Sequence, residues 1–158
     1  MYRVGIGFDV HRFTRNRKLV LGGVHIPCEL GLEGHSDADA LLHAVCDSIL
    51  GALGKNDIGS YFPDSDEKYK NIPSTDLLKE IKHILASDQY QIVNIDAVVI
   101  CERPKISPFI SEMKKIISNC LEIGETQIGI KATTTEGLGF TGRMEGVASK
   151  SIVLIKHM

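Results

Sequence analysis

The sequence predicts an α+β fold in which one mixed β-sheet carries helices packed on a single face. Apolar residues alternate at both ends of the chain, in segments 3–13 and 147–155, as is typical of strands. Between them, apolar residues recur every three or four positions, which is typical of helices. No repeat, linker or low-complexity tract interrupts these patterns, so we expect one domain over residues 1–158.

The composition excludes several classes of function. Apolar residues make up 43% of the 158 residues and charged residues 24%, as in ordinary globular chains. A net charge of −2 argues against a nucleic-acid partner, and no apolar run is long enough for a membrane span. The chain begins with a strand pattern, so we expect no signal or transit peptide. Four widely spaced cysteines without a Cys-x-x-Cys pair indicate reduced thiols in a cytoplasmic protein.

The first strand carries a candidate metal site at its end. Its apolar residues are Val4, Ile6, Phe8 and Val10, alternating with Gly5, Gly7, Asp9 and His11. This period of two predicts a strand with one buried face and places Asp9 and His11 together on the other. A carboxylate and an imidazole on a rigid strand supply two ligands of a zinc-type site. An ordinary solvated strand end remains the alternative.

A helix carrying His43 is expected to supply the third ligand. Ser36 is a good N-cap, Asp39 completes a variant of the capping box, and the helix should end near residues 51–54. Asp39, His43 and Asp47 recur at steps of four, so they share a helix face on which carboxylates could orient the imidazole. A solvated acidic face is the alternative. His35 lies just before this helix, whose positive end would favour a phosphate.

The remaining elements follow from local signals. Residues 19–26 indicate a second strand with a bulge or turn at Gly22 and Gly23. A helix capped by Ser74 should run to about residue 85, a strand from about 90 to 101, and a helix from about 107. The next strand starts at 127–131 and the last covers 147–155. Together they form a variant of the ferredoxin-like arrangement, with one sheet face left open for an oligomer contact.

Two further segments contain groups that suit a polar ligand. Segment 56–66 has no helical period, and Asp57, Asp64 and Asp66 could hold the hydroxyl groups of a polyol. Segment 133–136 places three threonine hydroxyls before Glu136, which suits phosphate and magnesium. A plain acidic surface loop and a threonine-rich edge strand are the respective alternatives.

Five motifs in this order resemble one enzyme family. They are 7–11 (GFDVH), 34–39 (GHSDAD) with His43, 57–59 (DIG) with 62–64 (FPD), 103–105 (RPK), and 133–136 (TTTE) with 140–143 (FTGR). The chain resembles the 2-C-methyl-D-erythritol 2,4-cyclodiphosphate synthase family over essentially its whole length. The resemblance implies a homotrimer with active sites between neighbouring subunits. It also implies conversion of 4-diphosphocytidyl-2-C-methyl-D-erythritol 2-phosphate into the cyclic diphosphate with release of CMP.

The resemblance also implies roles for individual residues. Asp9, His11 and His43 would ligate Zn²⁺, and Glu136 would help to bind Mg²⁺ or Mn²⁺. His35 and Thr134 would stabilise the transition state. The part of the substrate that lies near the metal, including its erythritol, would contact Asp9, Val10, His11, His35, Ser36, Asp57, Ile58, Gly59, Phe62, Pro63, Asp64, Ser65 and Asp66. The cytidine diphosphate would contact Cys101, Glu102, Arg103, Pro104, Lys105, Ile106, Ser107, Thr133, Thr134, Thr135 and Glu136. Phe140 and Arg143 would line a cavity on the threefold axis, where an isoprenoid diphosphate is a candidate ligand.

The residues present agree with such a reaction, because no convincing Ser-His-Asp or Cys-His arrangement offers a protein nucleophile. The substrate's own 2-phosphate would attack its own β-phosphorus, and the protein would supply positioning and charge. Two rival functions remain open. One is a phosphohydrolase acting on a nucleotide through a zinc-bound water. The other is a non-catalytic module whose zinc has a closed fourth ligand, such as Asp47 or a cysteine.

Overall fold

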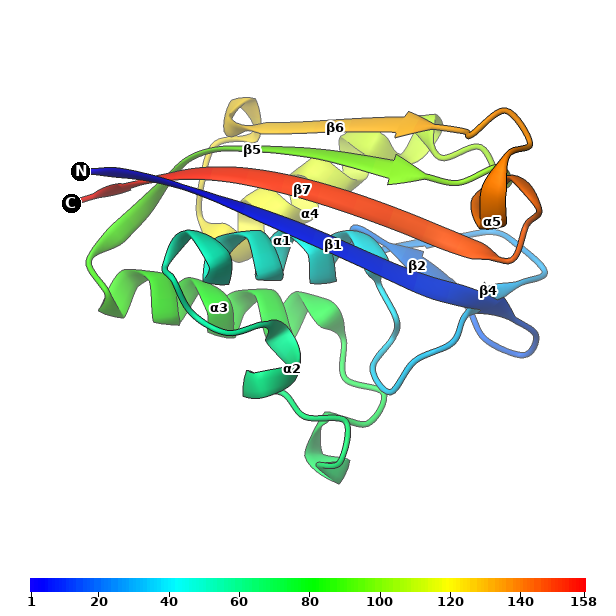
Figure 1. Ribbon diagram of the computed structural model, residues 1–158, viewed down its shortest axis with the longest axis horizontal. Coiled ribbons are helices and arrows are strands. Elements are labelled where there is room, and N and C mark those ends of the chain that lie inside the picture. The colour runs from blue at the N-terminus through cyan, green and yellow to red at the C-terminus, as the bar shows by residue number, and fades with distance from the viewer.

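The computed structural model describes all 158 residues and is built on a five-stranded sheet in the order β4-β1-β7-β5-β6 (Figure 1). Its strands are β1 (Tyr2–Thr14), β4 (Gly31–Leu32), β5 (Tyr90–Ile100), β6 (Ile128–Thr133) and β7 (Gly146–His157). Strands β5 and β6 run parallel, whereas the other neighbours are antiparallel. The predicted mixed sheet of an α+β fold is therefore confirmed.

Three helices pack on one face of this sheet (Figure 1). They are α1 (Ala40–Ala52), α3 (Ser74–Ser87) and α4 (Ile110–Leu121). Helix α1 lies against β1 and β7, α4 lies against β6, and α3 packs beside both helices. The core fills the space between these helices and the sheet. None of the helices combines the length and apolar character that crossing a bilayer requires.

Short elements connect these parts. They are the α-helical turns α2 (Ile58–Tyr61) and α5 (Gly139–Gly142) and the 3-10 turns Glu67–Tyr69, Ser107–Phe109 and Glu125–Gln127. Segment 56–66, expected to lack helix, therefore contains one helical turn, which Asp57 caps by accepting from the Ser60 amide at 3.2 Å. The helix expected from residue 107 begins with a 3-10 turn and becomes α-helical at Ile110.

The buried face of β1 is the opposite of the one that its apolar residues suggested. Gly5 and Gly7 are buried against α1, whereas the alternating apolar side chains are exposed. A Cβ atom on Gly7 would lie 1.9 Å from the Ala44 carbonyl oxygen, so only glycine admits the helix backbone here. The period of two was correct, but Val4, Ile6, Phe8 and Val10 lie on the open face of the sheet, together with Ile152 of β7.

The segment predicted as one strand over 19–26 forms a hairpin of two short strands, β2 (Leu19–Leu21) and β3 (Val24–Ile26). Gly22 and Gly23 make its turn with φ angles of 60° and 76°. Their amides donate to the Asp39 carboxylate at 2.9 and 2.7 Å. The turn is thereby fixed to the start of α1.

The N-cap prediction for α1 was wrong by three residues. The helix begins at Ala40, and Asp39 caps it by accepting from the Leu42 amide at 3.0 Å. Asp39 accepts hydrogen bonds from both the helix and the hairpin turn, whereas Ser36 has no contact with that turn. Asp47 accepts from the Ile58 amide at 2.7 Å. The carboxylates above and below His43 are thus engaged elsewhere, and their predicted role in orienting it was also wrong.

Candidate functional site

Strand β1 and helix α1 bring Asp9, His11 and His43 together. The Nε2 atom of His11 lies 2.9 Å from Oδ2 of Asp9, and Nδ1 of His43 lies 3.2 Å from the same oxygen. The two imidazole nitrogens are 3.1 Å apart. The close approach of α1 to the glycines of β1 allows this contact, because it brings His43 up to the strand. Asp9 and His11 lie within β1, which continues to Thr14, and not at its end as predicted.

This triad fits a divalent metal. Tetrahedral zinc with bonds of about 2.0–2.2 Å places its ligand atoms about 3.4 Å apart, close to the spacing of the three atoms here. His11 Nδ1 donates to the Glu33 carbonyl at 2.7 Å, so Nε2 is the nitrogen that faces the triad, where a metal would replace its proton. No fourth histidine, cysteine or acidic residue joins the cluster. A closed site completed by Asp47 or a cysteine is therefore absent, and one side remains for a ligand.

The charges within the triad support one another. Burial raises the pKa of Asp9, but hydrogen bonds and charge from His11 and His43 outweigh it and lower that pKa to about 2. Burial lowers the pKa of His11, but its hydrogen bond to Asp9 and the charge of that residue raise it overall. The carboxylate stays ionised at neutral pH, as a metal ligand must.

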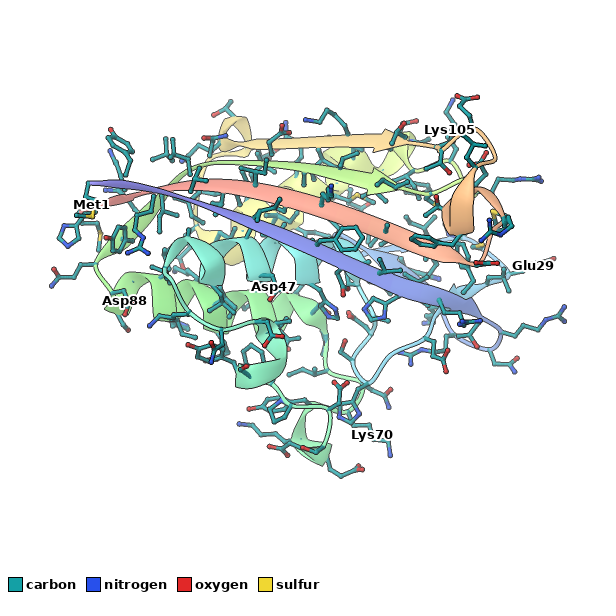
Figure 2. All side chains as sticks on the ribbon, viewed as in Figure 1. Met1, Glu29, Asp47, Lys70, Asp88 and Lys105 are labelled. Atoms are coloured by element: carbon teal, nitrogen blue, oxygen red, sulfur yellow. The ribbon has the colours of Figure 1, made fainter.

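A cavity of about 410 Å³ surrounds the triad. Predicted site residues in its lining are Asp9, His11, His35, Ser36, His43, Asp57, Ile58, Gly59, Phe62 and Asp64. Its lining also includes Asp47, which was expected beside His43, and residues that the sequence reasoning did not assign to it, namely Phe8, Gly34, Tyr69, Ile72 and Leu77. Figure 2 labels Asp47 on α1 and Lys70 near the tip of the segment that follows α2. We call this space the metal-side cavity.

Four predicted residues lie outside the lining of the metal-side cavity: Val10, Pro63, Ser65 and Asp66. Val10 is on the open sheet face. The Asp66 carbonyl accepts from His35 Nε2 at 3.1 Å, so this residue still contacts the site through its backbone.

The loop that carries His35 is held by contacts from distant parts of the chain. Arg17 donates to the carbonyls of Gly34 and Ser36, each at 2.5 Å. The Asn71 amide donates to the His35 carbonyl at 2.8 Å. We expected His35 to lie at the start of the helix. Because α1 begins only at Ala40, it does not. Sequence reasoning gave Arg17 no role, and no local signal could have shown it.

A second cavity of about 410 Å³ lies at the carboxyl ends of the parallel strands β5 and β6. Predicted site residues in its lining are Cys101, Glu102, Arg103, Lys105, Ile106, Ser107, Thr133 and Thr134. Figure 2 shows Lys105 at that end of the sheet, away from Asp47. We call this space the strand-end cavity. Burial, with the nearby Cys28, raises the pKa of Cys101 to about 12, so its thiol is unreactive.

The other predicted residues lie outside the linings of both cavities. Pro104, Thr135 and Glu136 are neighbours in sequence of the strand-end cavity residues. The Glu136 amide donates to Thr134 Oγ1 at 3.2 Å, and its carboxylate is exposed. Phe140 and Arg143 belong to α5 and the residue after it. Within one chain, the predicted site is therefore divided between two separate cavities.

Fold and site together define an α+β protein with a candidate metal triad and two cavities lined by predicted site residues. The sequence profile of the YgbB family matches residues 2–156. The 2-C-methyl-D-erythritol 2,4-cyclodiphosphate synthase of Caldicellulosiruptor bescii is 59% identical over 155 residues, which cover 98% of this chain and 99% of that protein. The chain belongs to the 2-C-methyl-D-erythritol 2,4-cyclodiphosphate synthase family, the YgbB family.

Solved structures agree with this assignment. The bifunctional IspDF of Campylobacter jejuni matches with a TM-score of 0.96 and 44% identity, covering 100% of this chain and 43% of that longer chain. The Plasmodium falciparum IspF in complex with CDP matches with a TM-score of 0.87 and 35% identity. That match covers 99% of this chain and 96% of the other.

Proposed function

We propose that this chain is a cyclodiphosphate synthase of the non-mevalonate route of isoprenoid biosynthesis. It converts 4-diphosphocytidyl-2-C-methyl-D-erythritol 2-phosphate into 2-C-methyl-D-erythritol 2,4-cyclodiphosphate and releases CMP. The observation that carries this proposal is the three-ligand triad, open on one side, within the metal-side cavity. Residues 1–158 act as one catalytic domain in the cytoplasm.

Different residues bind different parts of the substrate. Asp9, His11 and His43 hold Zn²⁺, and Glu136 contributes to a Mg²⁺ or Mn²⁺ site. When bound, these cations supply positive charge that offsets repulsion between the phosphates. Asp57 and the 62–66 segment hold the erythritol, for which carboxylates and backbone groups of the metal-side cavity are suited. The strand-end cavity holds the cytidine, and the Plasmodium falciparum relative in complex with CDP supports a cytidine site in this family.

The reaction needs no protein nucleophile. An oxygen of the 2-phosphate forms a bond to the β-phosphorus, the bond from that phosphorus to the α-phosphate oxygen breaks, and CMP leaves with that oxygen. Holding the two reacting groups in line can contribute roughly 7–11 kcal/mol to lowering the barrier. His35 and Thr134 donate hydrogen bonds to the phosphoryl oxygens as their charge changes.

We propose that the enzyme is a homotrimer whose active site joins the metal-side cavity of one subunit to the strand-end cavity of the next. The division of the predicted site between two cavities supports this assembly. The apolar open face of the sheet also supports it, because Ile6 is 64% and Phe8 51% exposed. Phe140 and Arg143 line the threefold axis, where an isoprenoid diphosphate is the candidate ligand.

Mixed trimers test this proposal. His43→Ala removes a metal-side group and Thr134→Ala a strand-end group, so each variant alone should release almost no CMP. Refolding the two variants together should restore activity to about a quarter of the sites, because those sites receive one intact half from each chain. Each variant refolded with itself is the control. Mixed trimers that form but remain inactive would contradict a site shared between subunits.

A further inference from the structure

We propose that Ser74 and Asp37 are positioning residues that fix the ring tautomer of His43 and so aim its Nδ1 lone pair at the metal. This inference rests on the proposed role of His43 as a metal ligand. It concerns two residues outside the triad: Ser74 begins α3, and Asp37 lies in the loop before α1. Neither was assigned a role in the site by the sequence motifs.

The two ring nitrogens of His43 face different surroundings. Its Nδ1 faces Asp9 and His11 within the triad. Its Nε2 lies 2.9 Å from Ser74 Oγ, and Ser74 is completely buried. A neutral imidazole carries one proton, so the partner of Nε2 decides which nitrogen keeps a lone pair for the metal.

The single hydroxyl proton of Ser74 is directed away from His43. Ser74 Oγ donates to the Asp37 carboxylate, and the Ser74 amide donates to the other carboxylate oxygen at 3.0 Å. The Asp39 amide adds a third donor at 3.2 Å. An ionised carboxylate accepts only, so Ser74 Oγ presents a lone pair to His43. Ser74 Oγ therefore accepts a hydrogen bond from Nε2–H, which opposes the pull of the Asp9 carboxylate 3.2 Å from Nδ1 and leaves Nδ1 for the metal.

A competing contact shows why Ser74 is needed. Ser36 Oγ lies 3.2 Å from the same Nε2 and accepts from the Ala38 amide at 3.1 Å. Its own proton is free to donate to Nε2, which would place the imidazole proton on Nδ1 and block the metal. The bond to Ser74 is shorter and is strengthened by the carboxylate behind it. Removing Ser74 leaves the Ser36 contact unopposed.

Asp37 has a second effect on the geometry. Helix α3 follows Pro73, which provides no side-chain cap, and the Asp37 carboxylate binds the free amide of Ser74 instead. The loop before α1 is thereby joined to the start of α3. The position of Ser74 Oγ relative to His43 is fixed from both sides, as an orienting partner of a metal ligand requires.

Nitrogen NMR of ¹⁵N-histidine-labelled, metal-free protein at about pH 9 reads the tautomer directly, because imidazoles are then neutral. The His43 signals are identified by their loss in His43→Gln. We expect the Nε2–H form in the wild-type protein and a gain of the Nδ1–H form in Ser74→Ala. Zn²⁺ affinity, measured by competition with a chromophoric chelator, should fall by roughly 10–100-fold in Ser74→Ala.

Ser48→Ala is the matched control, because Ser48 is a buried serine of α1 that bonds the Val45 carbonyl and Ser151 instead of the triad. It should leave the tautomer and the Zn²⁺ affinity unchanged. Wild-type His43 in the Nδ1–H form would overturn this inference, whatever the stability of the variants. So would equal Zn²⁺ affinity in Ser74→Ala and Ser48→Ala. A wild-type protein that binds no Zn²⁺ would overturn the proposed metal site itself, and this inference with it.

Discussion

Replacing Gly7 by alanine should separate α1 from β1 and thereby dismantle the proposed metal site. Gly7 lies on β1 two residues before Asp9, and its buried face touches α1 at Ala44, directly after His43. The added methyl group would meet helix backbone, which cannot move aside as a flexible side chain can. The triad is therefore sensitive to a residue that contacts no ligand.

The structure gives the size of the effect. The new Cβ atom would lie 1.9 Å from the Ala44 carbonyl oxygen and 2.8 Å from the Ser48 nitrogen. Ordinary carbon–oxygen contacts are about 3.3 Å, so helix and strand must separate by about 1.4 Å. Metal bonds tolerate about 0.2 Å. We expect a loss of Zn²⁺ affinity beyond about 100-fold and a loss of about 1–3 kcal/mol in the free energy of unfolding.

Chelator competition and urea unfolding of the metal-free protein measure both quantities. Gly51→Ala is the control. Gly51 lies on α1, the helix that Gly7 contacts, and its Cβ would meet only the Ile6 backbone at an ordinary 3.6 Å. Alanine at that helical position should stabilise the protein by about 0.5–1 kcal/mol and leave Zn²⁺ affinity unchanged. A Gly7→Ala variant with wild-type affinity and stability would refute the close packing as the origin of the site.

Three other predictions test separate features. Burial and the charge of Asp37 raise the pKa of Asp39 from 3.8 to about 6, against hydrogen bonds from three backbone amides. The native state therefore favours the protonated carboxyl. The unfolding free energy of the metal-free wild-type protein relative to Asp39→Asn should fall by about 2.4 kcal/mol as pH rises from about 4 to about 7, and a constant difference in urea denaturation would contradict this. Ile6→Glu should dissociate the proposed trimer into folded monomers in light scattering, whereas a persisting trimer would place the interface elsewhere. Arg17→Met should free the His35 loop and lower turnover at least about tenfold with Zn²⁺ content unchanged; unaltered kinetics would show that the loop needs no such anchor.

The long strands, the three main helices and the triad were predictable because each has a local signal, whereas β4 was not predicted and segment 19–26 was predicted as one strand. Alternation defined β1, and three- to four-residue spacing defined the helix carrying His43. The spacing of Asp9 and His11 on one strand placed both candidate ligands together. These patterns depend on neighbours within one turn or one pleat, so the sequence alone contains them.

Local signals did not predict which face of β1 is buried or where α1 starts. Periodicity shows that two faces differ but not which one meets a helix, and here the glycine face does so because only glycine admits α1. Ser36 has the local features of an N-cap, but Asp39 also binds the hairpin turn. Partners that are distant in sequence decided both outcomes.

The supporting residues of the site also lacked any local signal. Ser74 reaches His43 across 31 positions, and Arg17 reaches Ser36 across 19. The division between the metal-side and strand-end cavities follows from the packing of the whole chain. A motif shows which residues belong to a site, whereas only the fold shows which of them meet within one subunit.

Phosphorus NMR of the protein with 4-diphosphocytidyl-2-C-methyl-D-erythritol 2-phosphate, Zn²⁺ and Mg²⁺ tests the proposed function most directly. The phosphorus atoms of the substrate should disappear as those of a cyclic diphosphate and of CMP grow in equal amounts. Free phosphate or an open-chain diphosphate would instead show that water attacks the substrate. A folded, metal-loaded protein that left the substrate unchanged would contradict the proposed reaction.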